Sequence, residues 1–222
     1  MAATGLLIAI GIAALVGFGP VLGARLEARA RRRVPLRRAI ARMETTPIAA
    51  LHEGKRAKIR GVVSAREPLL KSPISERPCV GYRIGIDDAS HAPDLSWDPL
   101  VSREDWPSFL VADETGTVAV QGPPFEMLVE PSDRSEDLPQ TALALLAQHD
   151  VRMRDLWSYR KFWFEETLLE VGDRVVVVGR PSLTIDPAGR GLYREPPQLF
   201  VMRGTTDEPI VVLDDDDDEP VR

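Results

Sequence analysis

Residues 5–24, GLLIAIGIAALVGFGPVLGA, form an apolar run without a single charged side chain. About twenty residues in an α-helix rise about 30 Å, which matches the hydrocarbon core of a membrane. Pro20 lies near the end of the run, where a membrane helix tolerates it. The run therefore predicts one membrane-spanning helix, which we bound at residues 1–24.

The charges beside this run decide between a retained anchor and a cleaved signal peptide. A signal peptide carries its positive charge before the apolar segment. Here residues 25–42 follow the run and hold eight arginines against one glutamate. By the positive-inside rule this flank stays cytoplasmic, so we expect a single-pass protein whose soluble part faces the cytoplasm. The arginines expected at anionic lipid headgroups are Arg25, Arg29, Arg31, Arg32, Arg33, Arg37 and Arg38.

Residues 25–52, here called the neck, are expected to form a juxtamembrane helix or linker. Leu36, Ile40 and Met43 recur after Pro35 at helical spacing. Residues 207–222 carry the opposite charge, with eight acids and one arginine, and predict a solvated acidic tail. The sequence alone does not show whether this tail contacts the neck.

The hydrophobic pattern of residues 53–206 predicts a β-domain. Strand patterns cover residues 55–65, 78–88, 108–122, 161–181 and 197–204, residues 138–149 read as a helix, and one further strand pattern, at 209–213, follows just beyond this domain. Residues 87–107 and 121–137 read as long irregular loops. Six or seven strands with one inserted helix predict a mainly β fold, a small OB-like, partly closed β-barrel. Turns are expected at Asp113 with Gly116, where glycine permits positive φ, and at Gly172 with Asp173.

The composition argues against several kinds of chemistry. Cys79 is the one cysteine, so an intrachain disulfide and a multi-thiolate zinc module are excluded even with His52, His91 and His149 counted. No phosphate-binding loop or Gly-x-Ser-x-Gly elbow is present. We expect no catalytic residue, no metal site and no cofactor, and we expect Cys79 to be a packed, unreactive thiol.

Two pairs of adjacent acids are candidates for acid–base chemistry by residue type. Neighbouring residues on a strand point to opposite faces, so Asp87 with Asp88, or Glu165 with Glu166, cannot converge on one atom. We expect both pairs to lie on a solvated edge or in a turn.

The segment SPISERPCVGYR, residues 72–83, holds two prolines that restrict the preceding residues to extended conformations. It predicts a rigid turn that leads into a strand and presents a surface. Aromatic residues and arginine are enriched at binding hot spots, although the two tryptophans would equally serve to cover the barrel end. The candidate partner-binding residues are Ser72, Pro73, Ile74, Pro78, Tyr82, Arg83, Trp97 and Trp106.

The longer stretch LLKSPISERPCVGYR resembles the signature of the GIDE domain, in the family of the mitochondrial ubiquitin ligase activator of NF-kappa-B. FLVADETGTVAV and FEETLLEVGDRVVVVGRP resemble two further segments of that family, in the same order, and the likeness spans about residues 53–205. The resemblance implies structural motif positions at Cys79, Asp113, Gly116, Gly172, Asp173 and Gly179.

The chain departs from the ligases of this family. Their GIDE domain lies between two membrane helices and a RING follows, but no second apolar run follows residue 24 and one cysteine cannot build a RING. The resemblance therefore implies a RING-less, single-helix member, a membrane-anchored module that recognises a protein partner and is not itself an enzyme. One alternative is an accessory or degenerate relative of a membrane ubiquitin-ligase-type enzyme. A second is an OB-like nucleic-acid-binding domain, against which the net negative central region argues.

Overall fold

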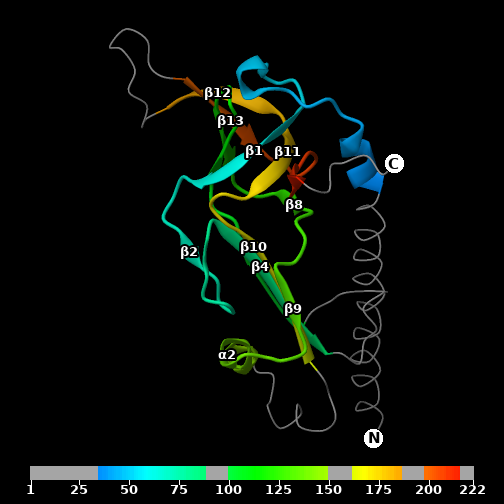
Figure 1. Ribbon diagram of the computed structural model, residues 1–222, viewed down its shortest axis with the longest axis vertical. Helices are drawn as coiled ribbons and strands as arrows, with labels where there is room; N and C mark the ends of the chain where they lie inside the picture. The colour runs from blue at the N-terminus through cyan, green and yellow to red at the C-terminus, as the bar shows by residue number, and fades with distance from the viewer. Residues whose placement is uncertain (1–34, 89–99, 150–161, 187–197, 216–222) are drawn as a thin grey trace, which may run out of the picture.

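The computed structural model describes residues 35–88, 100–149, 162–186 and 198–215 (Figure 1). The described part is mainly β and contains an eight-stranded sheet, a four-stranded sheet and a two-stranded hairpin. The large sheet has the strand order β12-β13-β7-β6-β1-β11-β14-β8 and is open, with β12 and β8 at its edges. Its strands are β1 (Ala57–Ala65), β6 (Phe109–Ala112), β7 (Thr117–Gln121), β8 (Phe125–Met127), β11 (Arg174–Gly179), β12 (Pro181–Ile185), β13 (Gln198–Arg203) and β14 (Ile210–Asp214).

The small sheet has the order β5-β4-β10-β9. Its strands are β5 (Val101–Asp105), β4 (Gly81–Asp88), β10 (Phe162–Leu169) and β9 (Asp133–Ser135). A two-stranded hairpin, β2 (Leu70–Lys71) with β3 (Pro78–Cys79), lies beside it, as does the helix α2 (Gln140–Gln148). In Figure 1 β4 and β10 extend away from the large sheet toward α2.

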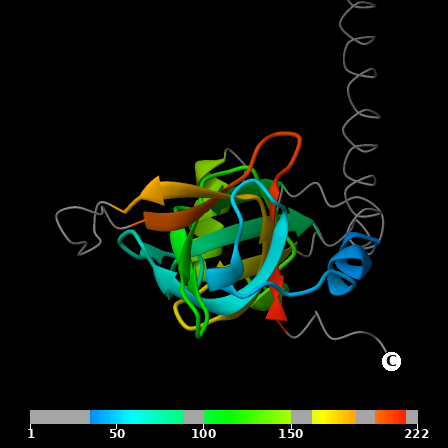
Figure 2. The ribbon, with the colours of Figure 1, turned by 90° about the horizontal axis from the view of Figure 1, so that it is seen from above.

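The strands of the large sheet curve around a common interior, which Figure 2 shows from above. This interior is a hydrophobic core of side chains that include Ile59, Val63, Phe109, Val111 and Met202. All adjacent strands pair antiparallel except β13 with β7 and β14 with β8, which are parallel. Only Arg180 separates β11 from β12, so one nearly continuous strand pairs with β1 in its first half and with β13 in its second.

The valine run of β11 is apolar on both faces because both faces are covered. Val175 and Val177 point into the interior core. Val176 and Val178 point outward, where they pack in a separate cluster with Ile40 of the neck. A strand that is buried on both sides reads as a continuous hydrophobic run instead of alternating.

The expected turn at Asp113 is present and is held by that carboxylate. The backbone N–H groups of Thr115 and Gly116 donate to Asp113 Oδ1 at 2.7 and 2.9 Å, and the N–H of Ile48 donates to Oδ2 at 2.9 Å. Burial is the largest single influence and raises the pKa of Asp113, but a hydrogen bond from the Thr115 hydroxyl at 2.6 Å and these three backbone bonds together bring the pKa below its usual value. Contrary to expectation, Gly116 does not adopt a positive φ. A Cβ at this position would lie 3.1 Å from Ile48 Cγ2, so the glycine is explained by the lack of room for a side chain.

The second expected turn, at Gly172 and Asp173, joins β10 to β11. Gly172 has a φ of +99°, in the region that L side chains rarely adopt, and Asp173 Oδ2 accepts a hydrogen bond from the N–H of Glu170 at 2.7 Å. Gly179 ends β11, where a Cβ would lie 3.4 Å from Met202 Sδ, in ordinary contact.

The second half of the neck is docked on the large sheet and is not a free linker. Residues 35–41 are helical, and Ile48–Ala50 form a short 3-10 helix, η1. Ile40 is buried against β11 and β14. The buried Lys58 of β1 donates from Nζ to the carbonyls of Ile40 and Met43 at 3.2 and 3.3 Å, which caps the C-terminal end of the helix. Residues 25–34 of the neck lie outside the described residues.

The strand predicted at residues 209–213 is confirmed as β14, which lies between β11 and β8, so the large sheet extends past residue 206 into the segment expected to be an acidic tail. The region 121–137, expected to be irregular, contains β8 and β9, and β5 and β12 were also missed. In the described ranges no helix is long and apolar enough to cross a membrane, and the expected anchor at residues 1–24 lies outside them.

Candidate recognition site

The segment that the sequence singled out forms a compact hairpin, here called the recognition hairpin, over residues 70–79. Leu70 pairs with Cys79 and Lys71 with Pro78. Within the turn the N–H of Ser72 donates to the Arg77 carbonyl at 2.9 Å, and Glu76 adopts a positive φ of 59°. The expected turn therefore exists, and a second backbone bond, from the N–H of Glu76 to the Ser72 carbonyl at 3.1 Å, closes it.

A buried carboxylate beneath the hairpin holds the turn in place. Glu166, at the centre of β10, is fully buried. Its Oε1 accepts a short hydrogen bond from the Ser72 hydroxyl and another from the N–H of Ser75 at 3.2 Å. Its Oε2 is buried without a hydrogen-bond partner in the described part of the chain. One carboxylate thus fixes two residues of a turn that lies more than ninety positions earlier in the chain.

This corrects the expectation for the acid pairs. Glu165 and Glu166 do point to opposite faces of a strand, but both are buried, and so is Asp87. The reason is that β10 lies in the interior of the small sheet, between β4 and β9, and not at an edge. Phe164 and Leu168 share the face of Glu166 and belong to the second core.

The helix α2 supports the hairpin from its other side. Thr141 Oγ1 donates to the Ile74 carbonyl at 2.8 Å. The Ile74 side chain is buried in the second core with Leu145 and Leu146 of α2. The turn is therefore fixed at its base by a carboxylate, a hydroxyl and an apolar side chain.

Cys79 contributes packing and not reactivity. Its thiol is fully buried in the same core. Burial, followed by the charges of Glu166 and Glu170, raises its pKa to about 11, with Arg77 acting in the opposite direction. The thiol stays protonated at neutral pH, and a protonated buried thiol is a poor nucleophile.

The exposed part of the hairpin is residues 75–78, here called the tip. Its four side chains, those of Ser75, Glu76, Arg77 and Pro78, are all exposed. Lys71 Nζ lies 2.8 Å from Glu76 Oε1 and lowers the pKa of this carboxyl, while Arg77 pairs with Glu170. The tip thus presents a patch of mixed charge with a proline beside it.

The structure divides the eight candidate partner-binding residues. Ser72, Ile74, Tyr82 and Trp106 are buried, so their side chains stabilise the site and cannot form its contact surface in this conformation. Trp106 belongs to the interior core and lies against Gly81, where a Cβ would be 2.4 Å from the indole ring. Of the two readings of Trp106, covering the core is therefore the one that its burial favours.

The remaining candidates are partly accessible or lie elsewhere. Pro73 is half-buried and Pro78 is exposed. Arg83 projects from the face of β4 opposite to Tyr82. There its guanidinium donates to the Met127 carbonyl at 3.4 Å and to Thr167 Oγ1 at 3.5 Å. Trp97 lies outside the described residues. Sequence reasoning missed Glu76 and Arg77 as surface groups, although their place between two prolines marks them as turn residues.

Only two of the seven candidate lipid-contacting arginines are described. Arg37 pairs with Glu130 at 2.6 Å and also donates to the Leu128 carbonyl, whereas Arg38 is exposed. The other five, Arg25, Arg29, Arg31, Arg32 and Arg33, lie outside the described residues.

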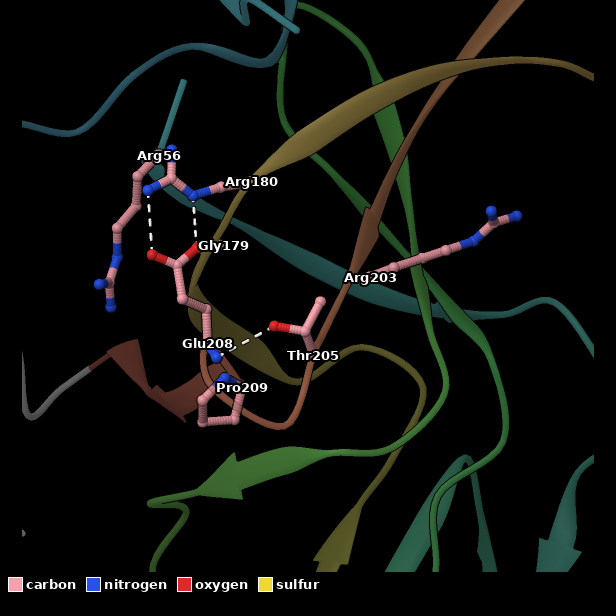
Figure 3. A pocket seen from close by; sticks show the side chains of 7 residues that line it. All are labelled: Arg56, Gly179, Arg180, Arg203, Thr205, Glu208 and Pro209. Carbon is pink, nitrogen blue, oxygen red and sulfur yellow. Dashed lines mark hydrogen bonds and ion pairs between the residues drawn. The ribbon is translucent and has the colours of Figure 1, made fainter. Parts of the chain in front are cut away.

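A hollow of about 100 Å³ opens at the end of β11, lined by Arg56, Arg180, Arg203, Thr205 and Glu208 among others (Figure 3). Arg180 and Glu208 form a two-pronged ion pair across it, with Arg180 Nη2 donating to Oε1 at 3.0 Å. Arg203 points away from this pair and bonds Gln121 instead. Three arginines and one glutamate line the hollow, so it keeps an excess of positive charge beside the Arg180–Glu208 pair. In the described ranges no three His, Cys, Asp or Glu are placed to hold a metal ion.

Comparisons with known proteins match no family model, no curated protein and no solved structure. The likeness to the GIDE-domain family accordingly rests on the three motif segments alone.

Proposed function

We propose that this chain is a membrane-anchored, cytoplasm-facing module that recognises or scaffolds a protein partner without a catalytic centre of its own. The observation that carries the proposal is the recognition hairpin, an exposed tip on a base fixed by Glu166, Thr141 and Ile74. A loop that is already ordered loses little conformational entropy when it binds, so its contacts contribute more fully to affinity.

The tip offers contacts that suit a protein surface. Glu76 and Arg77 place opposite charges side by side, and the exposed ring of Pro78 adds apolar area. Charged groups at the rim of an interface favour specificity and association rate. We expect a partner that matches this mixed pattern, and we assign the module to the RING-less, single-helix branch that the GIDE resemblance implies.

An OB-like barrel is the finer fold that we propose for residues 53–215. The strand order supports it: β1 pairs with β6, β6 with β7, and β7 with β13 in parallel. β13 returns through β12 and β11 to β1, because β11 and β12 are almost continuous. The helix α2 lies in the connection between β7 and β11, as the sequence expectation of an inserted helix requires.

The test is a comparison of partners captured in cells by two matched variants of the full chain. Glu76→Ala with Arg77→Ala removes one exposed acid and one exposed base from the tip. Arg180→Ala with Glu208→Ala removes an exposed acid and base from the hollow at the end of β11. After crosslinking and mass spectrometry, we expect a discrete protein set that the first variant loses and the second keeps. A set that both variants keep, or no enriched protein at all, would refute the proposal.

A further inference from the structure

Residues 127–132, here called the connecting segment, run from the last residue of β8 to the residue before β9 (Figure 1). At its beginning the segment lies beside β14, where the N–H of Leu128 donates to the Val212 carbonyl at 2.7 Å. At its end Ser132 lies beside β10 and donates to it. The segment therefore joins the large sheet to the small sheet.

The first half of the connecting segment is bound to the helix of residues 35–41, here called the neck helix. Arg37 Nη2 donates to the Leu128 carbonyl and to Glu130 Oε1, the latter at 2.6 Å. The Leu128 side chain is buried in the same outer cluster as Ile40. The docked neck helix thus holds this part of the segment against the large sheet.

The last residue of the connecting segment is bound to the part of β10 that holds the recognition hairpin. The N–H of Ser132 donates to the Glu166 carbonyl at 2.7 Å, and Ser132 Oγ accepts from the N–H of Leu168 at 3.0 Å. The side chain of Glu166 in turn accepts from the Ser72 hydroxyl and the Ser75 N–H. Ser132 therefore fixes the backbone of the same residue whose carboxylate fixes the turn.

The neck helix is the element of this arrangement that can open separately from the rest. It has about two turns, and a helix this short is not stable in water without tertiary contacts. Those contacts are the buried Ile40, the bonds of Lys58 at one end and the bonds of Arg37 near the other. The helix is therefore folded when docked, and its release, which needs less free energy than global unfolding, frees the connecting segment from Arg37.

We propose that docking of the neck helix and order in the recognition hairpin are coupled through the connecting segment. With the helix docked, Arg37 holds the segment, Ser132 holds β10 at Glu166, and Glu166 holds the turn. Release of the helix loosens these contacts one after another. Coupling between two sites is reciprocal, so a partner bound at the tip favours the docked helix by the same factor. The coupling rests on bonds within the fold, whereas its role in regulating recognition rests on the proposed function.

The test is hydrogen–deuterium exchange of the full chain in a non-ionic detergent, followed by mass spectrometry of its peptides. Arg37→Gln shortens the side chain and removes its bonds to the Leu128 carbonyl and to Glu130. We expect exchange to accelerate in the neck helix and, by at least about fivefold, in residues 70–79, since coupling between sites typically amounts to about 5–150-fold. Exchange in β7, which lies outside this route, should stay as in the wild type.

Arg38→Gln is the matched control, because it removes the same charge from the next residue of the same helix, where the side chain is exposed. It should leave exchange in residues 70–79 unchanged. Lys58→Met is a second perturbation, which loosens the helix at its C-terminal end and leaves Arg37 in place. Unchanged exchange in residues 70–79 in both Arg37→Gln and Lys58→Met would overturn the coupling. Equal acceleration in β7 would also overturn it, by showing that the chain opens as a whole.

Ser132→Gly tests the route, since it removes the hydroxyl that bonds the N–H of Leu168 and gives the backbone more freedom. We expect faster exchange in residues 70–79 in this variant, and little further acceleration when Arg37→Gln is added. A full additional acceleration would assign the coupling to another path and overturn the role of the connecting segment.

A second arm separates the coupling from the proposed function. In the capture experiment above, Arg37→Gln should lower the yield of the protein set that the variant Glu76→Ala with Arg77→Ala loses, and Arg38→Gln should not. An unchanged yield would overturn the regulation of recognition and leave the coupling intact. Because exchange is measured on the chain without a partner, failure of the coupling is distinguishable from failure of the proposed function.

Discussion

The hydrogen bond between Ser72 and Glu166 gives the sharpest quantitative prediction. Ser72→Ala removes a hydroxyl that donates to a fully buried carboxylate whose second oxygen has no partner in the described structure. A hydrogen bond to a charged group contributes about 1.5–3 kcal/mol, and the loss is at the upper end when the charge stays buried. We therefore expect Ser72→Ala to lower the free energy of unfolding by about 2–3 kcal/mol.

The reasoning is tested by repeating the change where the carboxylate is gone. In a Glu166→Leu background the Ser72 hydroxyl has lost this acceptor, so Ser72→Ala should cost less than about 1 kcal/mol. The double-mutant cycle should then give a coupling of about 1–2 kcal/mol. The assay is urea unfolding of the full chain in non-ionic detergent at a constant m-value, with Ser102→Ala, an exposed serine on β5, as the control.

If the losses in free energy of unfolding from Ser72→Ala and Glu166→Leu were additive, with a coupling below about 0.5 kcal/mol, the hydrogen bond between Ser72 and Glu166 would not stabilise the fold and the reasoning would be refuted. Limited trypsin digestion offers a second measurement on the same variants. Cleavage after Lys71, an exposed residue at the base of the recognition hairpin, should speed up in Ser72→Ala because that base is loosened.

Three further predictions follow from other contacts. Folding raises the pKa of Cys79 from 9.0 to about 11, so as the pH rises the thiol ionises in the unfolded chain before it does in the folded one. The thiol therefore makes its full contribution to the free energy of unfolding below about pH 9, and about 2–3 kcal/mol is lost as the pH rises through 11. Urea midpoints across that range should show this fall, and Cys79→Ala should remove it. Gly81→Ala places a methyl group 2.4 Å from the Trp106 ring and should cost about 1–3 kcal/mol in the same assay; an unchanged midpoint would contradict that packing. Lys58→Met removes the cap of the neck helix, so amide exchange in residues 35–41 should accelerate more than exchange in β7; equal acceleration would argue for a global effect instead.

Local patterns predicted much of the large sheet. The alternation in residues 55–65 and the valine run before Gly179 became β1 and β11, and the turn at Asp113 formed as its side chain required. Such elements are set by near neighbours in the chain, so their periodicity and turn chemistry are readable without the fold.

Long-range burial could not be read in the same way. Glu166 lies in an interior strand beneath a turn more than ninety residues away, and nothing in its own neighbourhood predicts a buried acid. Tyr82 has the composition of a hot spot, yet its ring fills the core beneath α2. β9 is only three residues long and carries no pattern of its own, so only its partner β10 defines it.

The docking of residues 35–52 on the large sheet also shortens the linker between the folded domain and the proposed membrane anchor. A fully extended chain over all 28 residues of 25–52 would reach roughly 95 Å from a membrane surface. Because the helix from residue 35 onward is part of the folded body, only the ten residues 25–34 remain, and they span roughly 35 Å at most. With the anchoring that we propose, the module would sample only a thin layer beside the membrane, where its local concentration would be correspondingly high. We would then expect its partners to be proteins that lie on, or protrude only slightly from, the same membrane.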